Sequence, residues 1–341
     1  MASGIIKDGV EWVLRELRKA AISYEDARVL VTGGTGFLGS WICDVLFQQG
    51  AKVTCLDNFS SGHPSNIGHL RNHDNFTFIE HDISQPINFN EKFDVVMHLA
   101  SRASPFEFSK FPIQILKANT LGIWVALGIA KKHKATLLYA SSSEIYGNPP
   151  PKYIPIPETY NGNVNPTGPR SCYDEAKRCG EAFVVAYHLQ HSLDTRIIRI
   201  FNSYGPRMRA GDVYGRVIPR FIDQALTNAL ITVFGDGTQT RAFTYVTDMI
   251  NGLLRAGLMP TARGQVINIG NNVETQIIQL AQLIKKLAKS NSSIKFYPLP
   301  IADPERRCPD ITRAQQLIRW QPTTCLEDGL KATIKWFKQI A

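Results

Sequence analysis

The sequence predicts an α/β fold with a doubly wound parallel sheet and a smaller C-terminal α/β part, and three observations support this. Short apolar runs alternate with helical segments from residue 28 onward. A glycine-rich turn follows the first run, and Asp57 ends the second run roughly twenty residues later. Strands and helices in this rhythm form a parallel sheet that helices cover on both faces.

The elements follow in order along the chain. We expect strands at 29–32, 52–57, 76–80, 93–100, 136–141 and 195–201, and helices at 37–49, 112–134 and 173–189. Residues 147–170 are rich in Pro, Gly and Asn, which predicts a long ordered loop of the kind that serves a site. We divide the chain into an N-terminal surface helix (1–26), a dinucleotide-binding domain (27–201) and a substrate domain (202–341). A further strand near 265–270 is a candidate to return to the main sheet.

Composition indicates a globular protein, since the 341 residues are 44% hydrophobic and 20% charged. Charged residues interrupt the apolar positions before residue 27, which argues against a signal peptide or membrane span there. We therefore expect an amphipathic surface helix in a cytoplasmic protein. The six cysteines form no C-x-x-C pair and are expected to be reduced thiols.

The net charge of +9 fits either nucleic-acid binding or an anionic small molecule held by arginines. The basic residues are scattered and form no dense run, so we expect neither a nucleic-acid nor a membrane partner. The histidine pairs His69/His73 and His188/His191 have no cysteine or acidic ligands at metal spacing, and we interpret them as solvated helix surface without a metal.

The glycines Gly33, Gly36 and Gly39 form a G-x-x-G-x-x-G turn between the first strand and the first helix. Glycines let the backbone approach a pyrophosphate, and the free amides of the helix N-terminus attract it. Asp57 can accept both ribose hydroxyls of an adenosine and repel a 2′-phosphate, so NAD is favoured over NADP. Asp82 and Ile83, after the third strand, either contact the adenine or form an ordinary turn, and the residues alone leave both open.

Tyr173 and Lys177 lie four residues apart on a predicted helix, which places phenol and ammonium on one face. A tyrosine titrates at about 10, so a neighbouring cation that lowers its pKa would make it a usable base. Beside a nicotinamide, such a base would allow a sugar hydroxyl to be oxidised.

Several phrases together resemble the extended short-chain dehydrogenase/reductases, the NAD-dependent epimerase/dehydratase family, from Arg28 onward. They lie at 140–147, 165–170, 173–178, 199–208, 239–243 and 303–310. Within this family the chain looks most similar to the UDP-glucuronate decarboxylases. The resemblance implies a Rossmann fold and a tightly bound, recycled NAD.

The triplet Ser142, Ser143 and Glu144 separates the possible reactions. Related 4,6-dehydratases carry an aspartate at the middle position, and Ser143 is too weak an acid for that elimination. The order Ser, Ser, Glu in this triplet resembles the pattern of the decarboxylases. Arg307 matches the arginine that faces the substrate carboxylate in that family, although the lysine that usually follows is Cys308.

Three positions depart from the family on the substrate side. Arg102 replaces a proline, Val125 stands where an asparagine is expected on the long helix, and Arg209 replaces a histidine. These departures fit an altered sugar, or an enzyme that stops at epimerisation.

The resemblance implies a mechanism and a set of site residues. Tyr173, assisted by Lys177 and Ser142, would oxidise C4 to a ketone with NAD, carbon dioxide would leave from C5, and the hydride would return, giving UDP-xylose. Glu144, Ser143 and Arg307 would orient the sugar and place charge. The NAD site would comprise Gly33, Gly36, Phe37, Leu38, Gly39, Asp57, Asn58, Phe59, Ser61, Gly62, Asp82, Ile83, Leu99, Ala100, Ser101, Tyr173 and Lys177. The nucleotide sugar would contact Lys117, Tyr187, Gln190, Asn202, Arg216, Arg241 and Arg307.

The helices at 112–134 and 173–189 resemble those that pair in the family's homodimers. Two alternative functions stay open. One is a UDP-glucuronate or UDP-glucose 4-epimerase, and the other is an NAD-binding regulatory or nucleic-acid-binding protein without activity. Retention of Tyr173, Lys177, Ser142 and Glu144 argues against the second.

Overall fold

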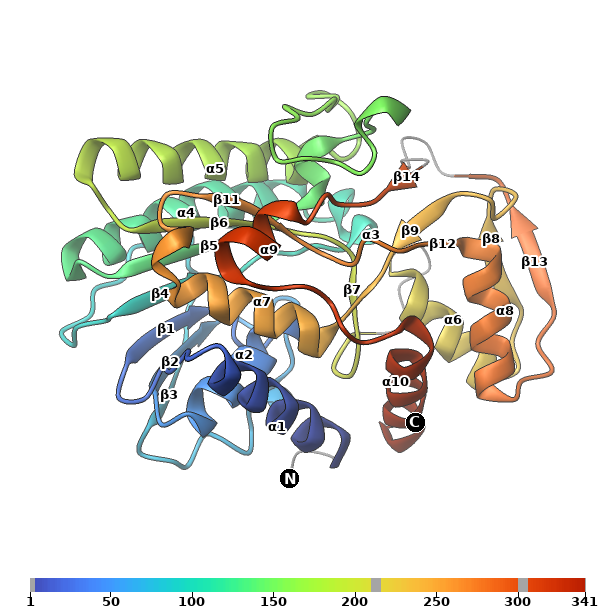
Figure 1. Cartoon of the computed structure of the whole chain (residues 1–341), viewed down its shortest axis with the longest axis horizontal. Helices are drawn as coiled ribbons and strands as arrows, with labels where there is room; N and C mark the ends of the chain where they lie inside the picture. Colours follow the sequence, from blue (N-terminus) through green and yellow to red (C-terminus); the bar gives the residue numbers. More distant parts are fainter. Residues whose placement is uncertain (1–3, 210–215, 300–305, 341) are drawn as a thin grey trace.

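The computed structural model describes residues 4–209, 216–299 and 306–340. Within them, parallel strands form one main sheet in the order β11-β6-β5-β4-β1-β2-β3 (Figure 1). The strands are β1 (Arg28–Thr32), β2 (Lys52–Asp57), β3 (Phe76–Glu80), β4 (Val95–His98), β5 (Thr136–Ser142), β6 (Thr195–Ile200) and β11 (Val266–Ile269). The predicted doubly wound parallel sheet is confirmed.

Helices cover both faces of the sheet (Figure 1). On one face lie α1 (Gly4–Lys19), α2 (Phe37–Gln48) and α7 (Val246–Leu258), and on the other lie α4 (Pro112–His133) and α5 (Ser171–His191). Successive side chains of a strand point to opposite faces. Val29, Val31 and Val95 therefore pack in the core under α1, α2 and α7, whereas Leu30 and Val96 pack in the core under α4 and α5.

Helix α4 is long and apolar enough to cross a membrane by length and composition. Its apolar residues Ile123 and Leu127 are fully buried in the core between the sheet and α5. Packing inside the fold therefore explains the buried side of α4, whereas Leu121 and Trp124 on the same helix are exposed.

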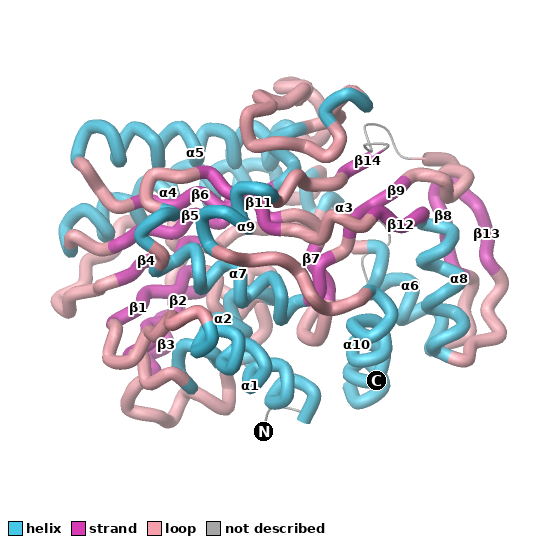
Figure 2. The backbone as a smooth tube through the Cα atoms, viewed as in Figure 1, coloured by secondary structure: helices cyan, strands magenta, loops and turns pink. Residues whose placement is uncertain are grey.

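The smaller part of the chain lies beside the sheet and is drawn at the right of Figure 2. It contains α6 (Val217–Leu226), β8 (Ile231–Phe234), β9 (Thr240–Ala242), β12 (Glu274–Gln276), α8 (Ile277–Ala288), β13 (Ile294–Tyr297), β14 (Arg306–Arg307) and α10 (Leu326–Ile340). Strand β9 lies between β12 and β14, and β8 pairs with β13. The remaining elements are short: α3 (Pro105–Phe108), β7 (Ser203–Tyr204), β10 (Thr244–Tyr245), α9 (Thr312–Ile318) and the 3₁₀ turns η1 (Pro64–Asn66), η2 (Ser143–Tyr146), η3 (Pro151–Tyr153) and η4 (Pro260–Ala262).

The chain returns to the main sheet after it has begun the smaller part. Strand β11 pairs with β6, with Ile267 opposite Ile198, and α7 packs against β5, β6 and β11. The candidate return near 265–270 is confirmed, so α7 and β11 belong in space to the dinucleotide-binding half. A division at residue 202 separates the halves in sequence but not in space.

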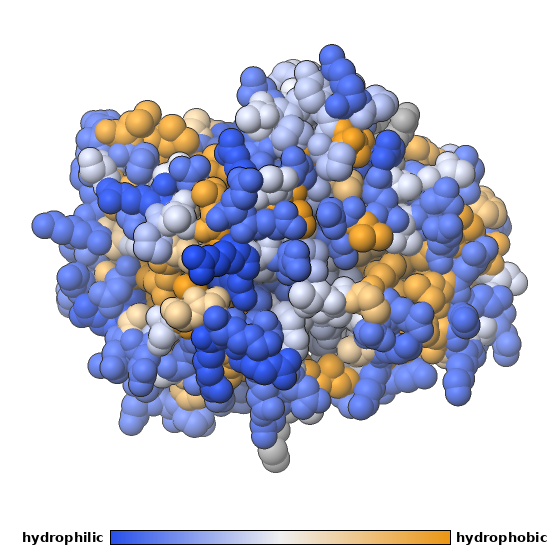
Figure 3. Space-filling view, viewed as in Figure 1, coloured by the Kyte–Doolittle hydropathy of each residue, from blue (hydrophilic) through white to orange (hydrophobic). Residues whose placement is uncertain are grey.

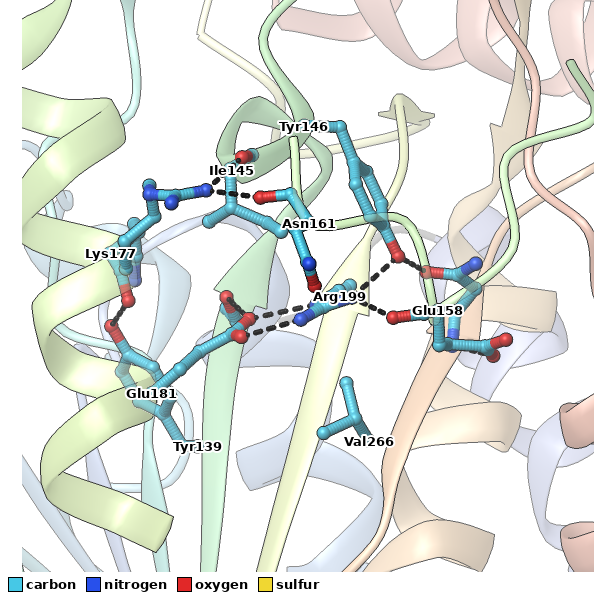
Figure 4. Close-up of polar contacts among 12 residues, drawn as sticks. Tyr139, Ile145, Tyr146, Glu158, Asn161, Lys177, Glu181, Arg199 and Val266 are labelled. Atoms are coloured by element: carbon cyan, nitrogen blue, oxygen red, sulfur yellow. Dashed lines mark hydrogen bonds and ion pairs between the residues drawn. The ribbon is translucent and has the colours of Figure 1, made fainter. Parts of the chain in front are cut away.

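The loop at 147–170 is tied to the sheet by a buried polar network around Arg199 of β6 (Figure 4). The guanidinium donates to both carboxylate oxygens of Glu181 on α5, at 3.0 and 2.7 Å. It also donates to the Tyr146 hydroxyl at 2.8 Å and to the carbonyl of Glu158 in the loop at 2.9 Å. Tyr146 in turn donates to Oδ1 of Asn268 on β11 at 2.8 Å. The network therefore joins two strands, a helix and the loop that borders the site.

Replacing Arg199 with methionine should destabilise the fold, because Glu181 would keep a buried charge without its partner. We expect a loss of about 3–5 kcal/mol in the free energy of unfolding, measured by urea denaturation. Arg28→Met is the matched control, since Arg28 pairs with Asp94 at 3.0 Å with both side chains well exposed, and it should leave the unfolding midpoint unchanged. Equal midpoints for the two variants would contradict the structural role of the network.

Candidate active site

A cavity of about 970 Å³ lies at the carboxyl ends of the main-sheet strands and extends to the smaller part. This edge is where open parallel sheets bind ligands. Of the expected site residues, those that line it are Gly33, Gly36, Phe37, Leu38, Gly39, Asp57, Phe59, Ser61, Gly62, Leu99, Ser101, Ser142, Ser143, Glu144, Tyr173, Lys177, Asn202, Arg216, Arg241 and Arg307. Both halves of the chain therefore contribute to one cavity.

The glycine turn fits a dinucleotide pyrophosphate. A Cβ on Gly39 would lie 2.1 Å from the carbonyl oxygen of Gly33, and Gly33 has a φ of +74°. Helix α2 begins after Gly36 with no side chain capping its amides. The turn is thus bare backbone beside free N–H groups, which suits a bound phosphate.

Asp57 ends β2 in the same cavity with a fixed side chain. Its Oδ2 accepts from the backbone N–H of Thr35 at 3.0 Å, and its Oδ1 accepts from the N–H of Phe59 at 2.8 Å. A carboxylate held in this way keeps further lone pairs for ribose hydroxyls. These residues fit NAD, and Gly33, Gly36, Gly39 and Asp57 would hold its pyrophosphate and adenosine ribose.

Four expected cofactor residues are not among the described residues that line the cavity. Asn58 and Asp82 each cap a turn, accepting from the N–H of Ser60 at 3.0 Å and of Ser84 at 2.9 Å respectively. Ile83 is buried in the core under α4 and α5. Ala100 packs behind the glycine turn. Of the two interpretations of Asp82, its hydrogen bond to Ser84 matches the ordinary turn at the end of a strand.

Tyr173 lies at the start of α5, where it is 5% exposed and its ring stacks on Phe108 at 5.1 Å. Lys177 is buried one turn later, and its Nζ donates to the carbonyl oxygen of Ala140 at 2.6 Å. The ammonium lies 5.8 Å from the centroid of the Tyr173 ring. The tyrosine and lysine therefore share one face of the helix, as the spacing predicts.

The expected lowering of the tyrosine pKa is wrong for the chain without ligands. Burial raises the pKa of Tyr173, and a hydrogen bond with Ser142 only partly offsets this. Burial also lowers the pKa of Lys177 to about 7, against the pull of Glu181. Helical spacing brings the two groups together, but the low dielectric around them disfavours both charges.

Glu144 is held between two arginines that come from distant parts of the chain. Arg170, just before α5, and Arg307, on β14, both donate to its carboxylate. Burial alone would raise the pKa of Glu144, but the two guanidinium groups outweigh it and hold the pKa far below its usual range. Glu144 is therefore a carboxylate near neutral pH, and the sequence pattern gave no sign that Arg170 would pair with it.

Two of the positions that depart from the family meet at one residue. Arg102 donates to Oε1 of Glu107 at 2.7 Å, and Arg209 lies 3.3 Å from the same oxygen. Glu107 is 4% exposed and lies in α3 beside Phe108. The two extra cations are thus matched by a buried acid, which sequence reasoning missed because the partners are up to a hundred residues apart.

Val125 and Cys308 take structural positions. Val125 packs in the core under α4 and α5, and the Cys308 thiol points to the carbonyl of Asn272 at 3.5 Å. Helix α4 does carry a buried asparagine six residues earlier, Asn119, whose Nδ2 donates to the carbonyl of Ile115 at 2.9 Å.

The expected contacts to the nucleotide sugar divide into two groups. Asn202, Arg216 and Arg241 line the cavity, together with Phe234 and Gln239, which the sequence did not single out. The exposed Lys117 on α4, and Tyr187 and Gln190 on α5, are not among its described lining residues. Tyr187 lies fourteen residues beyond Tyr173, about 21 Å along the helix axis, so the geometry does not support these three as contacts within one subunit.

His69 was expected on a solvated helix surface and is not there. Its Nε2 lies 2.7 Å from Oδ1 of Asp44, which is buried on α2. Arg207, which lines the cavity, pairs with the other oxygen of Asp44 at 2.8 Å. This cluster joins α2 to the chain that follows β7, so His69 has a structural partner.

Replacing Gly39 with alanine should abolish NAD binding, because the new Cβ would collide with the backbone of Gly33. Gly68→Ala is the matched control: its Cβ would meet only the carbonyl of Pro64, at an ordinary 3.6 Å. Bound NAD can be measured by releasing it from purified protein, with circular dichroism to check folding. A folded Gly39→Ala variant that retains NAD would contradict the assignment of the turn.

Comparisons with known proteins support the site. The model of the NAD dependent epimerase/dehydratase family matches residues 29–270. UDP-glucuronic acid decarboxylase 1 of Danio rerio is 46% identical over 92% of this chain and 73% of that protein. UDP-glucuronic acid decarboxylase 6 of Arabidopsis thaliana is 43% identical, over 92% and 90%.

A solved structure is similar over the same length. The UDP-glucuronic acid 4-epimerase from Bacillus cereus, in complex with UDP-glucuronic acid and NAD, has a TM-score of 0.81 and 29% identity, covering 92% of this chain and 100% of that one. The chain belongs to the NAD dependent epimerase/dehydratase family.

Proposed function

We propose that this protein converts UDP-glucuronate to UDP-xylose and carbon dioxide with NAD as a recycled cofactor. The observation that carries the proposal is Arg307, whose buried guanidinium reaches the cavity and pairs with Glu144. A guanidinium at the cavity can bind a carboxylate of the ligand as well as Glu144, and a hexuronate carries such a carboxylate whereas a neutral sugar does not. The identity of 40–46% with UDP-glucuronic acid decarboxylases supports the same conclusion.

The residues act in a defined order in this proposal. The glycine turn and Asp57 would hold NAD, which would supply the reversible oxidation of C4. Tyr173 takes the proton of the 4-hydroxyl, and the Ser142 hydroxyl hydrogen-bonds to the phenol and steadies its oxygen. Lys177 keeps its cation one helical turn away, where it favours the phenolate when it is charged.

The carboxylate at C5 leaves once C4 is a ketone, because its electron pair is then delocalised into an enolate. Arg307 orients that carboxylate, and the enolate takes up a proton from water at C5 once carbon dioxide has left. Glu144 is ionised, so its role is to hold Arg307 and Arg170 in place. Ser143 is a weak acid and does not favour elimination at C6.

Tyr173→Phe should retain NAD but lower the formation of UDP-xylose at least about hundredfold, since it removes the general base. Tyr153→Phe is the matched control, because Tyr153 stacks on Tyr160 in the 147–170 loop and does not line the described cavity. Products formed from UDP-glucuronate are separated by chromatography. UDP-galacturonate without gas would instead indicate a 4-epimerase, and turnover by Tyr173→Phe would remove this residue from the mechanism.

We also propose a homodimer that pairs α4 and α5 of two subunits. Large apolar side chains on these helices are exposed in the single chain: Ile113, Leu121, Trp124, Val185 and Leu189. Figure 3 shows apolar atoms gathered at the upper left, where Figure 1 places α5. Exposed apolar patches of this kind are typical of protein–protein interfaces.

The double variant Trp124→Glu, Leu189→Glu should be a monomer, because it buries two charges in the proposed interface. Val273→Glu is the control, since Val273 is 65% exposed in the loop before β12. Sedimentation velocity should give a dimer for the unaltered protein and the control. A monomeric unaltered protein at micromolar concentration would contradict the proposal.

A further inference from the structure

A second carboxylate lies beside the Glu144 ion pairs and has no place in the mechanism above. Asp174 follows Tyr173 on α5, and its side chain is 7% exposed. Its Oδ2 lies 3.8 Å from Nε of Arg170, the arginine that also binds Glu144. The described residues thus bring two acids and two arginines, Arg170 and Arg307, into one buried cluster.

The two acids are held differently. Glu144 accepts hydrogen bonds from both arginines. Within the described parts of the chain, Asp174 makes the longer contact to Arg170, and its buried Oδ1 has no hydrogen-bond partner there. A buried carboxylate oxygen without a donor is costly when it is ionised. Asp174 is therefore the member of the cluster that gives up its charge most easily.

The charges of the cluster balance only without an acidic ligand. With both acids ionised, the two arginines neutralise Glu144 and Asp174. A substrate carboxylate at Arg307 would add a third negative charge in buried surroundings. One proton taken up by the cluster would restore the balance.

We propose that Asp174 takes up this proton when an acidic sugar nucleotide places its carboxylate at Arg307, so that binding of the acid is coupled to protonation. This inference rests on the proposed function, because it assumes a uronate substrate. Asp174 does not line the described cavity and acts through Arg170 and Glu144. It is a positioning residue that makes recognition of the carboxylate depend on pH.

The electrostatics of the cluster support this assignment. Burial, and then the Glu144 carboxylate, raise the pKa of Asp174 to about 7, while Arg170 and Arg307 oppose the rise. Glu175 on the same helix also raises it. The Cys172 thiol and the Tyr173 phenol are the adjacent titratable groups, and the charge of Asp174 raises the pKa of each. A substrate carboxylate would raise the pKa of Asp174 further.

The pKa of Asp174 is lower in the free protein than in the complex, and this difference sets the direction in which affinity changes with pH. Well below pH 7 Asp174 is already protonated in the free protein, so affinity does not change with pH. Above pH 7 the free protein has lost the proton and must regain it on binding, so affinity falls as pH rises towards the higher pKa of the complex. If the pKa of Asp174 is about 8 in the complex, affinity should fall about sixfold between about pH 6.5 and about pH 8.5.

Titration calorimetry on the NAD-loaded Tyr173→Phe protein tests the inference without turnover. UDP-glucuronate should bind with proton uptake above pH 7, read from the dependence of the heat on the buffer's ionisation enthalpy. UDP-xylose, which lacks the carboxylate, should bind with no uptake and no such loss of affinity. Lys177 also titrates near pH 7. It has the same surroundings with either sugar, so a difference in proton uptake between the two ligands reports on the carboxylate.

Adding Asp174→Asn should remove both the proton uptake and the loss of affinity of about sixfold. Glu175→Gln, at the more exposed neighbouring acid, should keep them. Unchanged uptake in a folded Asp174→Asn protein would overturn the inference. If the Asp174→Asn variant does not fold, the Tyr173→Phe protein with Asp174 intact still tests the inference. Binding of UDP-glucuronate to that protein without proton uptake would overturn it equally. If UDP-glucuronate binds but no UDP-xylose forms in the unaltered enzyme, only the proposed function fails, and absence of binding at any pH removes both.

Discussion

The ion pair between Glu144 and Arg307 joins the two halves of the molecule at the point where chemistry is proposed. Glu144 lies in η2, the turn after β5, and β5 is next to the central strand of the main sheet. Arg307 lies on β14 of the smaller part. Arg307 also donates to the carbonyl of Gly147 at 3.2 Å, where the long loop begins. Both residues line the cavity, and the buried acid and the buried cation stabilise each other there.

Local sequence patterns were enough to predict the main sheet and the cofactor end of the cavity. Each predicted strand overlaps its observed range because the central strands are buried on both faces and therefore read as continuous apolar runs, such as Val29, Leu30 and Val31. The glycine turn and Asp57 likewise belong to one strand–helix–strand unit. Such features need no knowledge of distant contacts.

The substrate side was harder to predict because its contacts join distant residues. The pairing of Arg102 and Arg209 through Glu107 needs α3 and the chain after β7 to meet, which no spacing reveals. Tyr187 was assigned from resemblance and lies too far along α5. The tyrosine–lysine spacing gave the correct geometry for Tyr173, yet burial reversed the expected direction of its pKa shift.

The late position of β11 in the sequence has a consequence for folding during synthesis. The other main-sheet strands leave the ribosome in the first 200 residues, whereas β11 begins at Val266. Until it arrives, the outer edge of β6 presents unpaired backbone groups that can capture another chain. Helix α7, which precedes β11 and packs on β5 and β6, would cover the nascent sheet first and guide the last strand to its place.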